Sequence, residues 1–241
     1  MKHLPITHKL FVERRQEVFA YLRFLRAALA RDSCIRFPGQ SREFEFSTNK
    51  ELTHTLKANT YLLLYSVVEA TLTQAIDEIH GAIRASDAEL DQLHPRLFLQ
   101  VLRRFKHSKT DADDKNTHVP SGRSLIEFWL RDYETQDKAN KNYLFSGNLD
   151  GRKISEIGES YGFASGDQVK DAHLRHQSLK TTKDNRNILA HGELSFRYFG
   201  RDLIQGSIET DAVNLLRCVR AVIRTIDDYL AERRYLNAAT P

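Results

Sequence analysis

The sequence has few of the residues and patterns that mark secreted, all-β or membrane-spanning chains. Its 241 residues include two cysteines, Cys34 and Cys218, five prolines and 11 glycines. Two cysteines cannot form a disulfide framework and suit a reducing compartment. The scarcity of proline and glycine disfavours a β-rich chain with frequent turns. The sequence contains no run of about 18 apolar residues, so we expect no membrane span. The first residues lack the apolar core of a signal peptide, so the sequence predicts a cytoplasmic protein.

The charge balance is only mildly basic. The chain carries 36 Lys and Arg against 32 Asp and Glu, for a net charge of +4. Such a balance is below that of a protein that coats nucleic acid, yet it permits a polyanionic substrate.

The content of 41% hydrophobic residues is enough for a sizeable core. We therefore expect a single domain over residues 1–241.

Apolar residues recur three and four positions apart through most of the chain, and no segment alternates with a period of two. This periodicity predicts helices. We expect them over about 8–31, 49–85, 97–105, 124–133, 154–161 and 167–191, and in a last segment that Thr210 or Asp211 caps. The second helix is apolar on nearly every side between Tyr61 and Val68, which is typical of a central helix in a bundle. The predicted fold class is all-α.

Three segments between these helices are predicted as loops. Residues 32–50 contain Pro38 and Gly39 and are expected to form a loop on the core. Residues 106–122 offer the core almost nothing, so we expect a flexible, solvated insertion there. Residues 134–150 are polar and end in a turn cluster.

The helix that precedes Gly192 carries the candidate chemistry. Gly192 favours the left-handed conformation that often ends a helix. Asn187 and His191 are four residues apart and share one face, whereas Arg186 lies about 140° away around the helix. A long Arg side chain can nevertheless reach a phosphate shared with His191, or the same groups of a second subunit.

These residue types suit RNA cleavage by internal transfer. The reaction needs a base for the 2′-hydroxyl, an acid for the leaving 5′-oxygen and a cation for the added negative charge. Histidine titrates near neutrality, and the helix C-terminus favours protonated His191, which suits the acid role. Arg186 offers a permanent charge and a planar fork for phosphate oxygens. Spacing alone, however, favours a surface Arg and a capping His.

The surrounding sequence resembles the HEPN superfamily, and in particular its stand-alone bacterial nucleases of the MAE family. The segment RNILAHGELSF, from Arg186 to Phe196, is similar to the Arg-x4–6-His signature with Asn after the Arg. Further matching segments occur in order over roughly 200 residues of the chain. They are FVERRQEVFAYL, TYLLLYSVVEA, GNLDGRKI, YGF, LKTTKDNRNILAHGELSF and Gly200-Arg201.

The resemblance implies an antiparallel HEPN-type helical bundle that forms a homodimer, with the Arg–His helices of two subunits facing each other. It implies Arg186 and His191 as the catalytic pair, with Asn187 orienting the His or binding phosphate. It also implies an endoribonuclease of toxin–antitoxin or phage-defence systems that cuts tRNA, rRNA or mRNA and has a cognate antitoxin or adjacent defence protein. A bundle that binds RNA, nucleotide or a protein partner without cutting it, or a purely structural partner, stays an alternative.

Three further residues are candidates for supporting roles. Glu69 matches an acidic position common in HEPN bundles and is expected to orient Arg186 or His191, or else to be an ordinary helix-surface residue. Lys183 and Arg201 flank the proposed cleft and are candidates for phosphate contacts.

Other patterns predict no separate chemistry. His173 and His176 are three residues apart, but no further Cys or His completes a metal site, so we expect no metal or other cofactor. The sequence has no phosphate-binding loop of the GxxxxGK[ST] type, which argues against an NTPase. The row formed by Arg217, Arg220 and Arg224 is expected to be a solvated helix face, with RNA backbone binding as the alternative.

Overall fold

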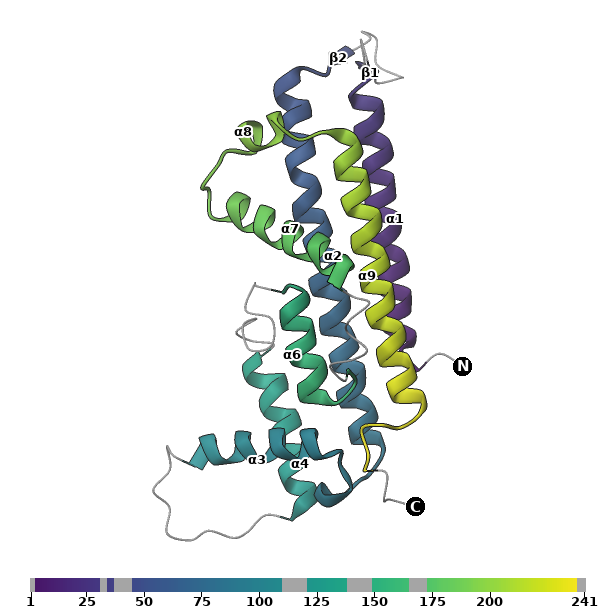
Figure 1. The fold of residues 1–241 in the computed structure, drawn as a ribbon, viewed down its shortest axis with the longest axis vertical. Coiled ribbons are helices and arrows are strands. Elements are labelled where there is room, and N and C mark those ends of the chain that lie inside the picture. Colours follow the sequence, from purple (N-terminus) through teal and green to yellow (C-terminus); the bar gives the residue numbers. More distant parts are fainter. Residues whose placement is uncertain are drawn as a thin grey trace.

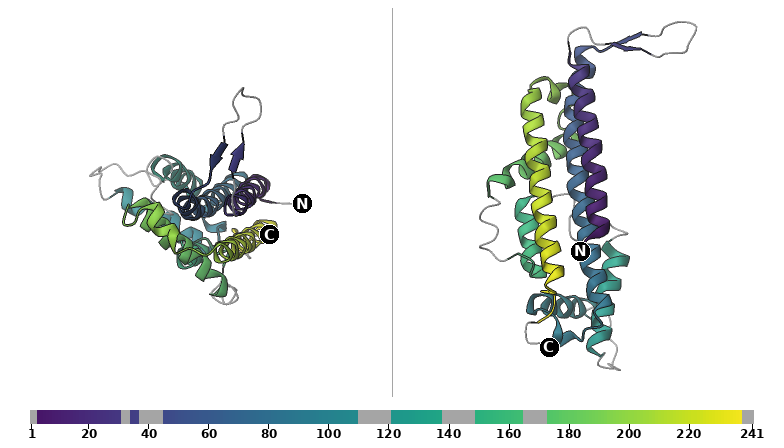
Figure 2. Two further views of the ribbon diagram at one scale, coloured as in Figure 1. Left: turned by 90° about the horizontal axis from the view of Figure 1, so that it is seen from above. Right: turned by 90° about the vertical axis from the view of Figure 1, so that its right-hand side faces the viewer.

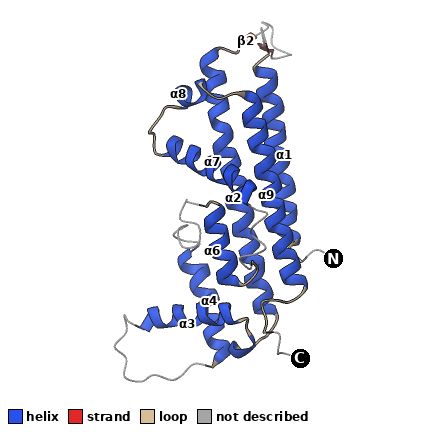
Figure 3. Ribbon diagram, in the orientation of Figure 1, coloured by secondary structure: helices blue, strands red, loops and turns tan. Residues whose placement is uncertain are grey.

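The computed structural model describes residues 3–30, 34–36, 45–109, 121–137, 149–164 and 173–237. Helices dominate these ranges, as Figure 3 shows. They are α1 (Pro5–Ala28), α2 (Lys50–Ala85), α3 (Pro95–Lys109), α4 (Gly122–Asp132), α6 (Gly151–Tyr161), α7 (His173–Ala190), α8 (Phe196–Arg201) and α9 (Gln205–Ala231). A short 3-10 helix at Leu90–Gln92 and a π-helical turn at Tyr133–Asp137 complete the helical elements. The all-α fold class predicted from the sequence is confirmed.

The helices α1, α2 and α9 run side by side along the long axis of the molecule (Figure 1). Figure 2 shows the three helices packed together in the view from above. The direction of α1 is opposite to that of α2 and α9, whereas α7 crosses their flank and α3, α4 and α6 gather at the lower end. The apolar residues expected on one face of the first helix are Phe11, Val18, Leu22, Leu25 and Leu29. The first four are buried, and Leu29, just past the end of α1, is half-buried.

The central helix α2 follows directly from its sequence. Asn49 caps its start, because the side-chain Oδ1 accepts a hydrogen bond of 2.8 Å from the backbone N–H of Leu52. Its apolar residues are buried on several sides, since α2 contacts α1, α7, α8 and α9. Ala58, Leu64 and Val67 are fully buried. The expectation of a central helix is therefore confirmed.

Carboxylates from other helices cap the start of α1. The backbone N–H of Leu4 donates to Asp227 of α9 at 3.0 Å, and that of Thr7 donates to Glu78 of α2 at 2.8 Å. Pro5 at the first helical position has no N–H to satisfy. These contacts explain why the helix begins before residue 8, where the apolar periodicity first predicts it.

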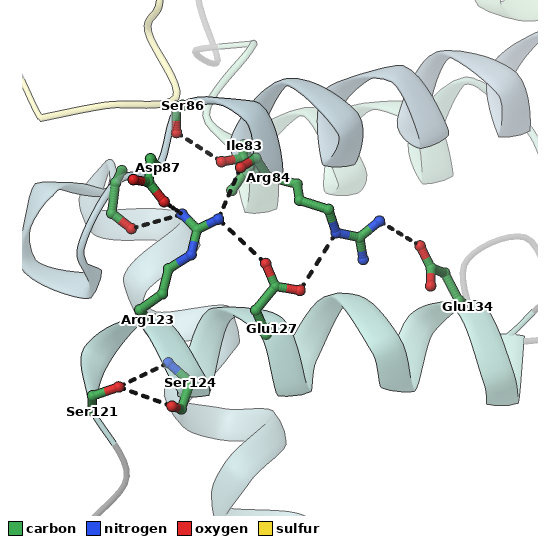
Figure 4. Close-up of polar contacts among 10 residues, drawn as sticks. Ile83, Arg84, Ser86, Asp87, Ser121, Arg123, Ser124, Glu127 and Glu134 are labelled. Atoms are coloured by element: carbon green, nitrogen blue, oxygen red, sulfur yellow. Dashed lines mark hydrogen bonds and ion pairs between the residues drawn. The ribbon is translucent and has the colours of Figure 1, made fainter.

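An ion-pair network joins the end of α2 to α4 (Figure 4). Arg84 lies 3.4 Å from Glu127 and 2.9 Å from Glu134. Arg123 donates to the backbone carbonyl of Arg84 at 2.9 Å and lies 3.5 Å from the carboxylate of Asp87. The guanidinium of Arg123 thus satisfies a carbonyl that the end of a helix leaves without a partner.

Several local expectations differ from the structure. Residues 34–36 and 45–47, within the expected loop, form a short antiparallel pair of strands, β1 (Cys34–Arg36) and β2 (Glu45–Ser47). The last helix begins at Gln205 rather than after Thr210, because Ile208 is fully buried and draws the first turn onto the core. The separate helix α8 was not expected.

The two helices that flank the expected insertion at 106–122 extend into it at both ends. Helix α3 continues to Lys109 and α4 begins at Gly122, whereas residues 110–120 lie outside the described residues. Part of the polar segment at 134–150 is also helical, as the π-helical turn after α4 shows, and residues 138–148 again lie outside the described residues. No described helix combines the length and hydropathy that a transmembrane span requires.

Candidate functional site

The end of α7 presents His191 to solvent. The backbone N–H of Glu193 donates to the carbonyl of Ile188 at 3.0 Å, and Gly192 adopts a positive φ of 70°. This pattern is a Schellman motif, in which glycine takes the left-handed position without a steric penalty. The left-handed cap expected at Gly192 is confirmed. His191 is the last residue before it, and its side chain is exposed.

Arg186 is held against the central helix. Its guanidinium carbon lies 4.4 Å from the ring centre of Tyr65, a buried residue of α2, and its Nη1 donates a hydrogen bond of 2.9 Å to Oδ1 of Asn187. A cation over an aromatic face is attracted by the ring, more strongly where water is excluded. Because five residues span about 7.5 Å of helix, Arg186 lies back from the exposed end that carries His191.

A second set of contacts connects Tyr65 to the start of α6. The Tyr65 hydroxyl accepts a hydrogen bond of 3.1 Å from the backbone N–H of Leu149. The next residue, Asp150, accepts from the backbone N–H of Lys153 at 3.0 Å and so caps α6. Its other carboxylate oxygen binds Nζ of Lys183 on α7 at 2.8 Å. The segment before α6 is therefore bonded to both helices that carry the site.

The Asp150–Lys183 pair is well shielded from solvent, with side chains 13% and 16% exposed. Burial alone would raise the pKa of Asp150, but the hydrogen bonds from Lys183 and the Lys153 backbone outweigh it and hold that pKa below its ordinary value. The hydrogen bond to Asp150 in turn raises the pKa of Lys183. The pair is ionised at neutral pH, so Lys183 is engaged with Asp150 rather than open to solvent.

Glu69 lies one turn after Tyr65 on α2. Burial raises the pKa of the Tyr65 hydroxyl, the charge of Glu69 adds to this rise, and the charges of Arg186 and Lys183 oppose it. The charges of Glu69, Lys183 and Arg186 thus all act on the Tyr65 hydroxyl, and Arg186 also contacts the ring. An orienting role of Glu69 toward Arg186 or His191 stays a prediction.

Arg201 is not part of this cluster. It lies at the end of α8, about half exposed, where it pairs with Asp202 at 3.0 Å and lies over the ring of Tyr198. Helix α8 packs closely on α2 at His54. The approach is so close that a Cβ on Gly200 would overlap the His54 carbonyl oxygen. The positions of His54 and Tyr65 on α2 are about 16 Å apart along the helix axis.

Tyr65 and Asp150 were not among the candidate site residues predicted from the sequence. Tyr65 lies in the stretch expected to be central in the bundle, and its burial fits that expectation, yet its ring face also contacts Arg186. Asp150 was part of the predicted turn cluster. The available signal was an Asp-Gly pair directly before a helical pattern, which is typical of an N-cap.

Two further aromatic residues, Tyr61 and Trp129, and two histidines, His173 and His176, remain to be placed. Tyr61 is buried and donates to Asp211 at 2.9 Å, and Trp129 packs edge-on against His80, so both are core aromatics. The side chains of His173 and His176 lie outside the described residues. Within the described ranges, no three His, Cys, Asp or Glu side chains are gathered so that they could hold a metal ion.

Comparison with known proteins identifies the family. The family described as HEPN_MAE_28990-like HEPN matches residues 9–235. No curated protein and no solved structure matches the chain. The matched range includes α2 with Tyr65, the start of α6 with Asp150, and α7 with Arg186, followed by His191. Because the match covers nearly the whole sequence, the chain belongs to the HEPN superfamily, in its MAE_28990-like family.

Proposed function

We propose that this HEPN protein is a metal-independent endoribonuclease. The 2′-oxygen of the RNA bonds to the adjacent phosphorus while the bond to the 5′-oxygen breaks, which leaves a 2′,3′-cyclic phosphate and a 5′-hydroxyl. One His191 takes the proton of the 2′-hydroxyl, and a second copy of His191 donates a proton to the 5′-oxygen. Arg186 binds the phosphate oxygens and stabilises the charge that develops on them.

The observation that carries this proposal is the contrast between Arg186 and His191 on one helix. The Arg186 guanidinium is placed by the Tyr65 ring and by Asn187, whereas the His191 imidazole is exposed at the helix end. A positioned cation and an accessible acid–base group are two components that phosphoryl transfer needs. The bond from Arg186 to Asn187 supports a role for Asn187 in orienting Arg186.

A second protomer completes the site in this proposal, because the reaction uses two histidines. Three large apolar residues that follow His191 in the sequence are exposed: Leu194, Tyr198 and Ile204, by 37%, 52% and 71%. Exposed large apolar side chains are candidates for a protein–protein contact. These residues support a homodimer whose two His191 side chains share one cleft.

Cleavage of a mixture of tRNA, rRNA and mRNA in EDTA tests the proposal. We expect the wild-type protein to cut RNA and leave 2′,3′-cyclic phosphate ends. His191→Ala should lose at least about a thousandfold in rate, since it removes both acid and base. Its melting temperature should stay unchanged, because the side chain is exposed.

The matched control is His3→Ala, which removes an exposed histidine at the other end of the chain. It should cut RNA at the wild-type rate. Retention of that rate by His191→Ala would overturn the catalytic assignment. RNA binding without cleavage, weakened by Arg186→Ala, would instead establish the alternative of a non-catalytic RNA-binding bundle.

The biological setting that fits this activity is that of a toxin or phage-defence effector in the cytoplasm. An exposed acid–base group on a ribonuclease is a hazard to cellular RNA, so a neutralising partner is expected. We propose a cognate antitoxin or adjacent defence protein that covers the end of α7.

The continuous core from α1 to α9 also supports a single HEPN-like domain over residues 1–241.

A further inference from the structure

A cavity of about 770 Å³, half open to solvent and lined by both polar and apolar groups, lies at the lower end of the bundle, where α2, α6 and α9 end and α3 begins. Small-molecule sites in proteins commonly have volumes of about 300–1,000 Å³. Eleven residues line the cavity: Ser86, Ala88, Gln92, His94, Pro95, Gly162, Glu232, Arg233, Arg234, Leu236 and Asn237. Ser86 lies about 30 Å along α2 from Tyr65, so this cavity is separate from the Arg186 site.

Arg233 occupies a backbone position that favours glycine. The helices α6 and α7 both end with a left-handed glycine, Gly162 at φ 82° and Gly192 at φ 70°. The end of α9 has the same hydrogen-bond pattern as the end of α7, yet Arg233 takes the left-handed position at φ 51°. A non-glycine residue is strained there, and such strain is concentrated at ligand-binding sites. The helix dipole favours a cation at the C-terminus of α9, which accounts for a charge at this position, whereas the left-handed backbone of Arg233 remains strained.

The charges around the cavity leave Arg233 available. Arg234 is paired with Glu232, whose carboxylate lies 3.0 Å from Nε. Among the described residues, Arg233 makes no ion pair, and its side chain is exposed. One guanidinium is thus neutralised and one is not, so the charged side chains that line the cavity sum to a net positive charge.

His94 adds a hydrogen-bond donor. Its Nδ1 accepts from the backbone N–H of Arg96 at 3.2 Å, which places the proton of the neutral ring on Nε2. Burial, and then the charge of Arg96, lower the pKa of His94, so the ring is neutral at pH 7. The imidazole packs closely against Gly162, where a Cβ would lie 2.7 Å from it. The ring is therefore fixed in orientation.

We propose that this cavity binds a small organic anion whose head group is a phosphate or a carboxylate. Arg233 binds the head group through its guanidinium fork, and the Nη atoms of Arg234, whose Nε is paired with Glu232, add further donors. The polar, uncharged body of the ligand contacts Gln92, Asn237 and His94. This site operates independently of the proposed RNA cleavage, since it shares no residue with that site.

Isothermal titration calorimetry with three probes tests the proposal. Glucose 6-phosphate, gluconate and glucose share a polar body and differ in the head group. We expect at least one of the two anions to bind with a Kd below about 1 mM, and glucose to bind at least tenfold more weakly. Preference between the two anions identifies the head group.

Arg233→Gly is the decisive variant, because it removes the guanidinium and relieves the backbone. Affinity for the anion should fall at least tenfold, while the melting temperature rises by about 2–4 °C. Arg233→Asn provides a second variant, since asparagine tolerates the left-handed region. It should lose the same affinity.

Two matched controls separate backbone and charge effects. Asp87→Gly relieves the other left-handed non-glycine residue, at φ 54°, whose side chain is 93% exposed. Arg224→Gln removes one exposed positive charge from the same helix as the cap. Both should bind the anion as the wild type does. Equal affinity in Arg233→Gly and the wild type, or no preference for either anion over glucose, would overturn the proposal.

Discussion

Tyr65 combines a core position with a contact to the proposed phosphate-binding residue. Its ring lies 4.4 Å from the guanidinium carbon of Arg186, and its hydroxyl accepts a hydrogen bond from Leu149. The ring and the hydroxyl are separate functions of one side chain. The ring positions Arg186, whereas the hydroxyl holds the segment before α6.

This separation predicts different effects of two substitutions. Tyr65→Phe keeps the aromatic face and should retain kcat within about threefold, whereas Tyr65→Leu should lower kcat about tenfold, because a cation–π contact contributes about 1 kcal/mol or more. Steady-state RNA cleavage measures both. Tyr61→Leu, one turn earlier on α2, controls for the loss of a buried aromatic ring. An equal loss of kcat in Tyr65→Phe and Tyr65→Leu would contradict a positioning role of the ring.

Gly200 is required by a close approach of α8 to α2. A Cβ at this position would overlap the backbone carbonyl of His54, which cannot move without bending α2. Gly200→Ala should therefore reduce the free energy of unfolding by about 3 kcal/mol. Urea denaturation measures this change.

Gly206 is the matched control for that substitution. It lies in the first turn of α9, where a Cβ would have no neighbouring atom within 4 Å. Gly206→Ala should raise the free energy of unfolding by about 0.5–1 kcal/mol, since alanine favours the helix. Similar effects of the two substitutions would show that the α8 contact is not tight.

At the scale of elements, Asp150 joins the N-terminus of α6 to α7 through Lys183. The pKa of Asp150 in the folded protein lies below its ordinary value of 3.8. The ionised carboxylate therefore contributes its whole stabilisation of the fold at pH values above 3.8. This contribution is lost as the pH falls through the lower folded pKa. We expect the stability of the wild type to decline below about pH 4 more steeply than that of Asp150→Asn.

Urea denaturation between pH 3 and pH 7 checks this difference. At pH 7, Asp150→Asn should be the less stable protein, because Lys183 loses its partner in a shielded site. Glu17→Gln is a suitable comparison, since this residue pairs with Arg14 in a more exposed position on α1. Parallel pH profiles for wild type and Asp150→Asn would contradict the assigned pKa direction.

For the whole molecule, the arrangement of the site predicts a dimer. His191 lies at an exposed helix end, and Ile204, 13 residues later in the sequence, is 71% exposed. Sedimentation at micromolar concentration should show a dimer for the wild type. Ile204→Glu should dissociate it and lower cleavage at least tenfold, because a charge in an apolar contact is costly.

Val12→Glu is the control for this experiment, since Val12 is an exposed apolar residue on α1, away from the site. This variant should remain dimeric and active. A wild-type protein that is monomeric at micromolar concentration and still cleaves RNA would contradict the composite site.

The fold class and the helix that carries the candidate pair could both be predicted from the sequence. Apolar spacing identifies helices through local periodicity, and Gly192 marks the end of α7 through its own backbone freedom. These features depend on neighbours in the chain. For the same reason the periodicity misplaced the start of α9, where the burial of Ile208 rather than a local cap extends the helix.

Which distant residues meet depends on how the helices pack. Tyr65 of α2 and Asp150 at the start of α6 are distant in sequence from Lys183 and Arg186 of α7, and the packing of α2, α6 and α7 brings them together. The same holds for the cavity at Arg233, which forms where four helix ends converge. Contacts of this kind arise from interhelical packing, and no local sequence pattern encodes it.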